Sequence, residues 1–518
     1  MQNIRSRIAK FLFLGLLFTG CSDDFLDLKP LDQEVTATFY KTEEQALQAL
    51  VSIYDVLGYD ETPGVSWAPV VTVSDMLSDD SYAGGADAND GMEEDQLNTF
   101  NIPANNVLLH AIWIKNYEGI YRANKLLEVI DGVEASDEFK TRLKAEAKFL
   151  RAFFYFEQVS FFENIPLLTA TIKGPSEYSQ PQAEPSAVYN QIALDLTDAM
   201  ADLPSVIPPS ESGRVSKWAA QALLGRVYLF YNGVYGQELK AGDLTVDRTY
   251  VVNKLDELIA TSGHDLLPNY EDNFKLVGEF GVESVFEISY GDNFPWWDWG
   301  YVRGGDGNLA AQMQGPRVTG SNKWNRGWSF APVSQKLVND IKDDPRYDMT
   351  VLREEELDGN LDKGYQHTGY FSQKYSSDAE HWGAAGQFEL NRTVNRRVIR
   401  FSDVLLMAAE LGSPNAQQYL DRVRSRVGLP SVPATEENIY KERRYELSLE
   451  GLRYFDVIRK GVAYAQSQLT YSGIRGPKYV GEQVLFDVNF NAASRGFMPI
   501  PQSEIDLSGG MFTQNAGW

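Results

Sequence analysis

AEAKFLRAFFYFEQV (145–159) and RVSKWAAQALLGRVYLF (214–230) each repeat apolar side chains at steps of three and four residues. That spacing places the apolar side chains on one face of an α-helix. Ser216 stands just before the second apolar stripe, where a hydroxyl side chain can cap the first turn of a helix. The small residues between Ala219 and Gly225 allow a neighbouring helix to approach closely. The two stretches therefore predict long helices that pack against other helices.

The same periodicity recurs along most of the chain. We expect one helix that begins at Thr42, a second over 113–130, and a third over 188–203 between two prolines. Successive helices of this length predict helical hairpins, as in tetratricopeptide arrays, although the strict repeat signature is absent from the sequence. Between residues 265 and 397 the pattern changes to one expected strand, 285–290, and long segments rich in Gly, Asn and aromatic residues. The expected fold class is mainly α: a tetratricopeptide-like helical-hairpin scaffold with an inserted loop-rich lobe that contains short strands.

The first 20 residues have the composition of a targeting segment. Basic residues precede an eight-residue apolar run, 11–18, and the small pair Thr19-Gly20 stands before Cys21. This arrangement resembles a bacterial lipoprotein signal, in which Cys21 becomes the lipidated first residue of the mature chain; a structural cysteine near an uncleaved helix is the alternative. Cys21 is the only cysteine, so it cannot form a disulfide within the chain. No later stretch of the sequence reaches the ~20 apolar residues that a membrane-spanning helix requires.

The overall composition is that of an acidic globular protein. Hydrophobic residues make up 43% of the chain, enough for a large core, and the formal net charge is -25. A charge of this sign repels phosphate backbones and anionic lipid surfaces, which argues against nucleic-acid binding and peripheral membrane binding. Because no internal disulfide can form, stability must come from the size of the core.

The strongest functional signal is a group of aromatic residues in the loop-rich lobe. Five of the ten tryptophans fall between positions 296 and 328, among Gly, Asp and Asn residues. An indole can cover the apolar C–H face of a sugar ring while polar side chains bind its hydroxyl rim, and each stacked ring is worth about 1–2.5 kcal/mol. Trp328 precedes a helix-entry segment and is as consistent with packing as with binding, while Trp382 is a further candidate. The candidate platform residues in the lobe are Trp296, Trp297, Trp299, Tyr301 and Trp324.

Other chemistry finds little support in the sequence. The four histidines form no metal-spaced pair, and there is no phosphate-binding GxxxxGK loop and no GxSxG elbow. The acidic loop over 79–95 has the residue types of a calcium site, but Met92 stands where a calcium loop beginning at Asp87 needs glycine. We therefore expect a solvated loop and no cofactor, with structural calcium as the alternative.

Several ordered motifs give the chain a family resemblance. Together with the two helix motifs above, they resemble the SusD/RagB family of outer-membrane nutrient-binding lipoproteins over nearly the whole mature chain. The further motifs are CSDDFLDLKP (21–30), WIKNYEGIYRAN (113–124), VIRFSDVLLMAAE (398–410), ERRYELSLEGLRYFDVIRKG (442–461) and FMPIPQSEIDLSGGMFTQNAGW (497–518).

The resemblance implies a scaffold of four tetratricopeptide-like units, a lipid anchor in the outer membrane with the protein facing the cell exterior, and a SusC-like TonB-dependent transporter as partner. It also implies that ligands bind on the lobe and on the loop after the first helix, where this chain has Trp67, Asp75, Tyr82 and Asn89. Of these, Trp67 and Tyr82 join the candidate binding residues. The expected organisation is a signal peptide (1–20), a lipidated tether (21–33), an N-terminal helical region (34–264), the ligand-binding lobe (265–397) and a C-terminal helical region on the same scaffold (398–518).

The charged residues of ERRYELSLEG (442–451) are expected to form structural ion pairs rather than an active site. Helical spacing allows these side chains to pair along or between helices, and the resemblance implies a folding role for them. Arg151 is likewise expected to tie helices together.

Three hypotheses for the function remain. The preferred one is a non-enzymatic, surface-exposed lipoprotein that captures oligo- or polysaccharide and delivers it to the transporter. The second is capture of oligopeptides on the same scaffold, as on the RagB side of the family, which would favour an extended groove with backbone partners. The third is a glycoside hydrolase, in which Asp298 or Asp306 would need a second carboxylate about 5–9.5 Å away. The sequence offers no evident pair of this kind, so we expect no enzyme.

Overall fold

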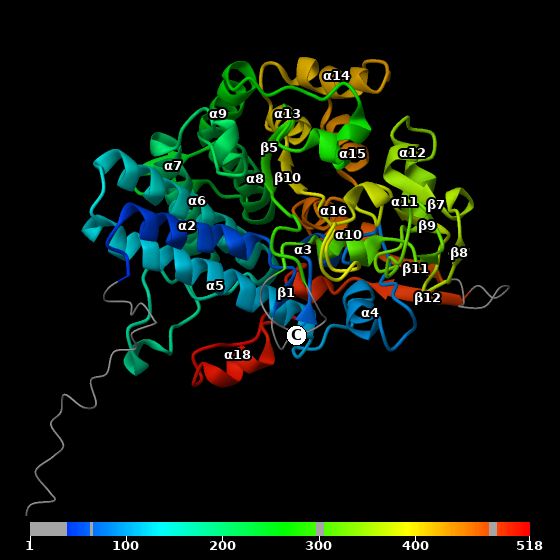
Figure 1. The fold of residues 1–518 in the computed structure, drawn as a ribbon, viewed down its shortest axis with the longest axis horizontal. Helices are drawn as coiled ribbons and strands as arrows, with labels where there is room; N and C mark the ends of the chain where they lie inside the picture. Colours follow the sequence, from blue (N-terminus) through cyan, green and yellow to red (C-terminus); the bar gives the residue numbers. More distant parts are fainter. Residues whose placement is uncertain (1–38, 63–65, 297–304, 476–483) are drawn as a thin grey trace, which may run out of the picture.

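Helices make up most of the regular structure and fill the left and upper parts of the view in Figure 1. The computed structural model describes residues 39–62, 66–296, 305–475 and 484–518 of the chain. The expectation of a mainly helical scaffold is confirmed. The α-helices are α2 (Glu43–Leu57), α3 (Val70–Met76), α4 (Met92–Asn98), α5 (Val107–Val129), α6 (Asp137–Phe162), α7 (Pro185–Asp202), α8 (Lys217–Tyr235), α9 (Arg248–Thr261), α10 (Leu309–Gln314), α11 (Gln335–Ile341), α12 (Tyr347–Thr350), α13 (Phe401–Glu410), α14 (Ala416–Arg426), α15 (Glu436–Leu447), α16 (Arg453–Ile458), α17 (Val462–Leu469) and α18 (Gln502–Leu507).

The helical frame is built from consecutive helices that pack on one another. Helix α5 packs on α6, α6 on α7, α7 on α8 and α8 on α9, while α2 lies against both α5 and α6 (Figure 1). The expected cap Ser216 accepts the Ala219 N–H at 3.3 Å, and the helix expected to begin at Thr42 is capped by that residue, which accepts the Gln45 N–H at 3.3 Å. No helix among the described residues is both long enough and apolar enough to span a membrane.

The strands form two-stranded ribbons rather than one sheet. The expected strand is β5 (Ser284–Ile288), which pairs antiparallel with β10 (Arg396–Arg400), with Arg396 opposite Ile288. This ribbon joins the two ends of the loop-rich lobe where they meet the helical frame. The other antiparallel pairs are β1 (Glu61–Thr62) with β2 (Ser66–Trp67), β3 (Leu239–Ala241) with β4 (Leu244–Val246), β6 (Val318–Thr319) with β8 (Asn360–Leu361), β7 (Val351–Arg353) with β9 (Tyr370–Ser372), and β11 (Thr470–Arg475) with β12 (Val484–Asn489).

One large hydrophobic core unites the frame. Its buried side chains come from positions between Ala46 and Ile500, so the N-terminal and C-terminal helices share it. The lobe contains smaller apolar clusters of its own, including one built from Trp324, Leu352 and Phe371. The apolar clusters of the lobe are therefore small, and polar contacts must help to hold the lobe against the helical frame.

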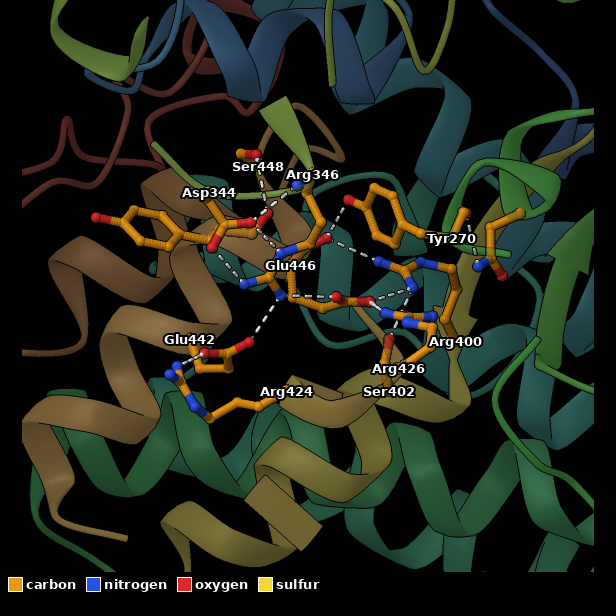
Figure 2. A network of polar contacts seen from close by, with 12 residues as sticks. Tyr270, Asp344, Arg346, Arg400, Ser402, Arg424, Arg426, Glu442, Glu446 and Ser448 are labelled. Atoms are coloured by element: carbon orange, nitrogen blue, oxygen red, sulfur yellow. Dashed lines mark hydrogen bonds and ion pairs between the residues drawn. The ribbon is translucent and has the colours of Figure 1, made fainter. Parts of the chain in front are cut away.

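A buried network of charged side chains lies where the lobe meets the C-terminal helices (Figure 2). The carboxylate of Glu446, on α15, accepts hydrogen bonds from Arg400 at 2.7 Å, Arg426 at 2.5 Å and Arg346 at 3.0 Å. Glu446 is fully buried; burial opposes its charged form, but the neighbouring arginines outweigh burial and hold its pKa well below the usual range. The predicted structural role of the ERRYELSLEG charges is confirmed, and the pairs of Glu446 run between elements, which is one of the two arrangements expected.

Arg151 of α6 ties three segments together, as predicted. Its guanidinium donates to both carboxylate oxygens of Asp195 on α7, at 2.8 and 2.6 Å, and to the side-chain oxygen of Asn124 on α5 at 2.8 Å. Because both Arg151 and Asp195 are buried, this bidentate pair fixes the spacing of the three helices.

Candidate functional site

The main pocket lies between the helical frame and the loop-rich lobe. Its volume is about 740 Å³, which is within the range of ligand pockets in proteins. The helical frame contributes Trp67 and Leu108 to the lining. Helix α4 and the loop before it contribute acidic side chains, and the lobe contributes the other lining residues. The lining residues are Ser66, Trp67, Ala86, Asp90, Glu93, Glu94, Leu108, Met313, Arg317, Val318, Thr319, Arg326, Gly327, Trp328, Phe330, Asp362 and Glu389.

Two indole rings face each other in this lining. Trp67 and Trp328 are stacked, with ring centroids 5.0 Å apart and ring planes inclined by 15°. Both side chains are half-buried, so each ring combines a packed side with an accessible part. Trp67 is carried by the β1–β2 hairpin, where it lies opposite Glu61, directly after helix α2.

Trp328 is held by an unusual stretch of backbone. Its N–H donates to the carbonyl of Gln312 in α10 at 3.0 Å, and its ring Nε1–H donates to Glu389 at 3.1 Å. The flanking residues Arg326 and Ser329 both have φ of 57°, a left-handed conformation that is costly for residues other than glycine. Gly327 lies so close to Gly315 that a Cβ on it would meet the Gly315 carbonyl carbon at 2.1 Å. Strained backbone of this kind concentrates at functional sites, where surrounding structure holds it in place.

The polar part of the lining contains both acidic and basic groups. Arg326 lies 3.5 Å from Glu389, and Arg317 lies 3.7 Å from Asp362, so each guanidinium has a carboxylate beside it. Glu94 is 5% exposed, and burial raises its pKa to about 8. The pocket thus offers flat apolar ring faces surrounded by hydrogen-bonding groups, the arrangement that a sugar ring requires.

The candidate residues in the structure fall into different environments. Trp67 lines the main pocket, but Tyr82 is 3% exposed and packs edge-on against Phe486 at 5.1 Å between ring centroids. Trp324 is also 3% exposed and belongs to a small core of the lobe. Neither Tyr82 nor Trp324 lines the pocket, because each ring is taken up by packing contacts.

Trp296 lines a second, smaller pocket of about 170 Å³ together with Tyr59, Tyr290 and Asp306. Burial raises the pKa of Asp306. The other three aromatic candidates, Trp297, Trp299 and Tyr301, lie outside the described residues, as does Asp298.

Two of the three remaining candidates, Trp382 and Asp75, have structural partners. Trp382 donates its ring N–H to the Ser377 carbonyl at 3.1 Å and packs against Phe388. Asp75 is buried and accepts the Gly451 N–H at 3.0 Å, and Asn89 is an exposed loop residue.

The acidic loop considered as a calcium site is dispersed in the structure. Asp79 is buried and pairs with Arg453 at 2.7 Å and Lys336 at 2.6 Å, whereas Asp87 accepts N–H groups of its own loop. Within the described residues, no group of three or more His, Cys, Asp or Glu side chains could hold a metal ion.

Sequence reasoning did not include Trp328 and its polar neighbours among the candidate binding residues. Trp328 lies in the tryptophan-rich segment, but its place before a helix-entry segment was equally consistent with packing. Its stacking on Trp67 joins residues far apart in the chain, and no spacing rule predicts such a contact. The local signals available were the crowding of tryptophans between positions 296 and 328 and the glycine before Trp328.

Comparisons with known proteins agree with this architecture. The chain matches the SusD family over residues 350–518 and a family described as starch-binding, associating with outer membrane, over residues 24–229. The SusD-like protein P25 of Formosa agariphila is 26% identical over 517 residues, which covers 88% of this chain and 90% of that protein.

Solved structures extend the likeness to the whole fold. A laminarin binding SusD-like protein is 32% identical, with 92% of this chain and 100% of that chain covered and a TM-score of 0.80. Surface glycan-binding protein A from Bacteroides thetaiotaomicron, in complex with laminarihexaose, is 27% identical with the same coverage and a TM-score of 0.78. The fold is therefore that of the SusD-like helical scaffolds. The chain belongs to the SusD family, and the resemblance found in the sequence is confirmed.

Proposed function

We propose that this protein is a non-enzymatic, surface-exposed lipoprotein that captures oligo- or polysaccharide in the Trp67–Trp328 pocket and delivers it to a SusC-like TonB-dependent transporter. The stacked indoles are the observation that carries the proposal, because flat apolar rings within a polar lining match the two-sided chemistry of a sugar. The complex of a relative with laminarihexaose supports the same ligand class.

Anchoring follows from the N-terminal sequence. Lipidation of Cys21 after removal of residues 1–20 would hold the protein at the outer membrane, and the acidic Ser22-Asp23-Asp24 segment resembles an export signal to the cell surface. Replacing Cys21 by serine should move the protein from the membrane fraction to the soluble fraction and abolish labelling by palmitate. Palmitate labelling that persists in the Cys21→Ser variant would refute lipidation at Cys21.

Binding is tested by calorimetry of the soluble protein, from residue 22 onward, against a panel of neutral and acidic polysaccharides. Trp67→Ala and Trp328→Ala should each weaken binding of the retained polysaccharide about 5- to 70-fold, the loss expected for about 1–2.5 kcal/mol of stacking. Tyr178→Ala, which removes an exposed ring outside the pocket, is the matched control and should bind normally. Unchanged affinity in both tryptophan variants would move the site elsewhere.

Two further measurements test the absence of catalysis and the delivery step. Incubation with the bound polysaccharide should generate no new reducing ends, and their appearance would refute the non-enzymatic assignment. Affinity purification from cells that express the anchored protein and its transporter should recover a SusC-like partner; its consistent absence would count against delivery.

A further inference from the structure

The charges around the main pocket are unevenly distributed. Among the described lining residues, the acidic side chains are Asp90, Glu93, Glu94, Asp362 and Glu389, whereas the basic ones are only Arg317 and Arg326. A site for an acidic polymer needs cations that are available to the ligand, because arginine and lysine are the groups that bind carboxylate and sulfate.

Each arginine of this lining already has a carboxylate beside it. Arg317 lies 3.7 Å from Asp362, and Arg326 lies 3.5 Å from Glu389, so both guanidinium charges are already balanced locally. An anionic ligand would gain less from either arginine than from an arginine without a neighbouring carboxylate, because part of the charge is already compensated.

The acidic groups of the α4 end of the pocket are not balanced in the same way. Within the part of the chain that the structure describes, Asp90 accepts the Ala86 N–H at 2.7 Å, and no lysine or arginine forms an ion pair with Asp90, Glu93 or Glu94. Burial raises the pKa of Glu94 to about 8, so its carboxyl is mostly protonated at pH 7 and acts as a hydrogen-bonding group. The uncompensated negative charge therefore rests on Asp90 and Glu93.

We propose that this pocket selects uncharged glycans and rejects polyanionic ones, such as polymers with uronate or sulfate groups. The proposal rests on the glycan-capture function above and adds the substrate class. Each carboxylate of a ligand within about 4–6 Å of an unbalanced acidic side chain would weaken binding about three- to sixfold in water, and more strongly in a partly enclosed pocket.

The experiment compares substituted forms of the same polymer. Hydroxyethyl and carboxymethyl derivatives of a neutral glucan carry substituents of similar size, but only the second is charged. Calorimetry at pH 7 and 0.15 M NaCl, where remote charges are screened beyond about 8 Å, should give at least fivefold tighter binding of the hydroxyethyl form. Several glucan backbones, together with alginate and pectate, make up the panel.

Charge variants assign the effect to the pocket. The double variant Glu93→Gln with Asp362→Asn removes one unbalanced negative charge and the carboxylate beside Arg317. It should reduce the ratio of the two derivatives' affinities at least threefold. The matched control is Glu43→Gln with Glu44→Gln, which removes the same charge from the exposed first turn of α2, at the end of that helix remote from Trp67. This control should leave the difference unchanged.

The outcomes distinguish the inference from the function on which it rests. Equal or tighter binding of the carboxymethyl form, or binding of alginate or pectate alone, would overturn the selectivity while leaving glycan capture intact. An equal shift in the pocket and control variants would also overturn it, because the effect would then come from the overall charge. Failure to bind any polysaccharide of the panel would overturn both proposals.

Discussion

Replacing Glu446 by glutamine would remove one negative charge from the buried network of Figure 2 while preserving side-chain volume. Three guanidinium groups, those of Arg346, Arg400 and Arg426, donate to this carboxylate, and all four side chains are at most 3% exposed. Breaking a buried ion pair by removing one partner costs about 3–5 kcal/mol, because the remaining charge is left without compensation.

This cost converts into a modest shift of the melting temperature because the chain is long. With about 2.1 cal/mol/K of unfolding entropy per residue, a chain of this size has a total of about 1 kcal/mol/K. If the fold unfolds as one cooperative unit, Glu446→Gln should lower the Tm by about 3–5 °C at pH 7.

Differential scanning calorimetry measures this shift directly. The matched control is Glu437→Gln, which neutralises an exposed glutamate on the same helix α15 and should change the Tm by less than 1 °C. A Glu446→Gln variant that melts within 1 °C of the control would refute the view that this carboxylate balances the buried arginines.

Three further predictions concern packing and pH. Trp324→Ala should lower the free energy of unfolding by about 3–5 kcal/mol, without changing glycan affinity below the melting transition, since the ring is buried in the lobe; calorimetry and binding assays that gave the reverse pattern would place Trp324 in the site. Gly119→Ala should destabilise by about 1–3 kcal/mol, measured by urea unfolding, because its Cβ would lie 2.4 Å from the Phe154 ring; a stabilised variant would contradict this close packing. Burial opposes the charge of Asp403, but Arg443 and a second guanidinium outweigh it and lower the pKa to about 2. This stabilisation is complete above the unfolded pKa of about 4 and is lost as pH falls towards 2, so wild type should lose about 2 kcal/mol more than Asp403→Asn between pH 6 and 2; equal losses would refute it.

The helical frame could be predicted because its signals are local. Apolar spacing within α6 and α8, and the caps at Thr42 and Ser216, depend on residues a few positions apart. The partner choices within the charged motif could not be predicted, since Glu446 on α15 meets arginines from β10, α14 and the start of α12. Sequence spacing identified these charges as structural, but only the fold decides which side chains meet.

The binding surface was harder to predict for the same reason. Crowded tryptophans directed attention to the lobe, but local sequence cannot tell a ring that packs from a ring that lines a pocket. Trp324 and Trp328 are four residues apart in similar surroundings, and yet one is in a small core and the other is stacked on Trp67. Tyr82 lies in a candidate loop, but its ring packs on Phe486, which comes from near the other end of the chain.

The position of the pocket explains why buried charges lie at the junction of lobe and frame. Trp67 belongs to the frame, because its hairpin follows α2 and packs on α5. Trp328 belongs to the lobe, where its backbone N–H donates to Gln312 of α10. The indole stack, and with it the pocket wall, forms only when the lobe is docked in one orientation. Apolar contacts tolerate small sliding movements, whereas charge-assisted hydrogen bonds between arginine and carboxylate groups are directional. The β5–β10 ribbon and the Glu446 network thus set the relation between the two walls of the pocket, which is a structural reason to bury so many charges in one place.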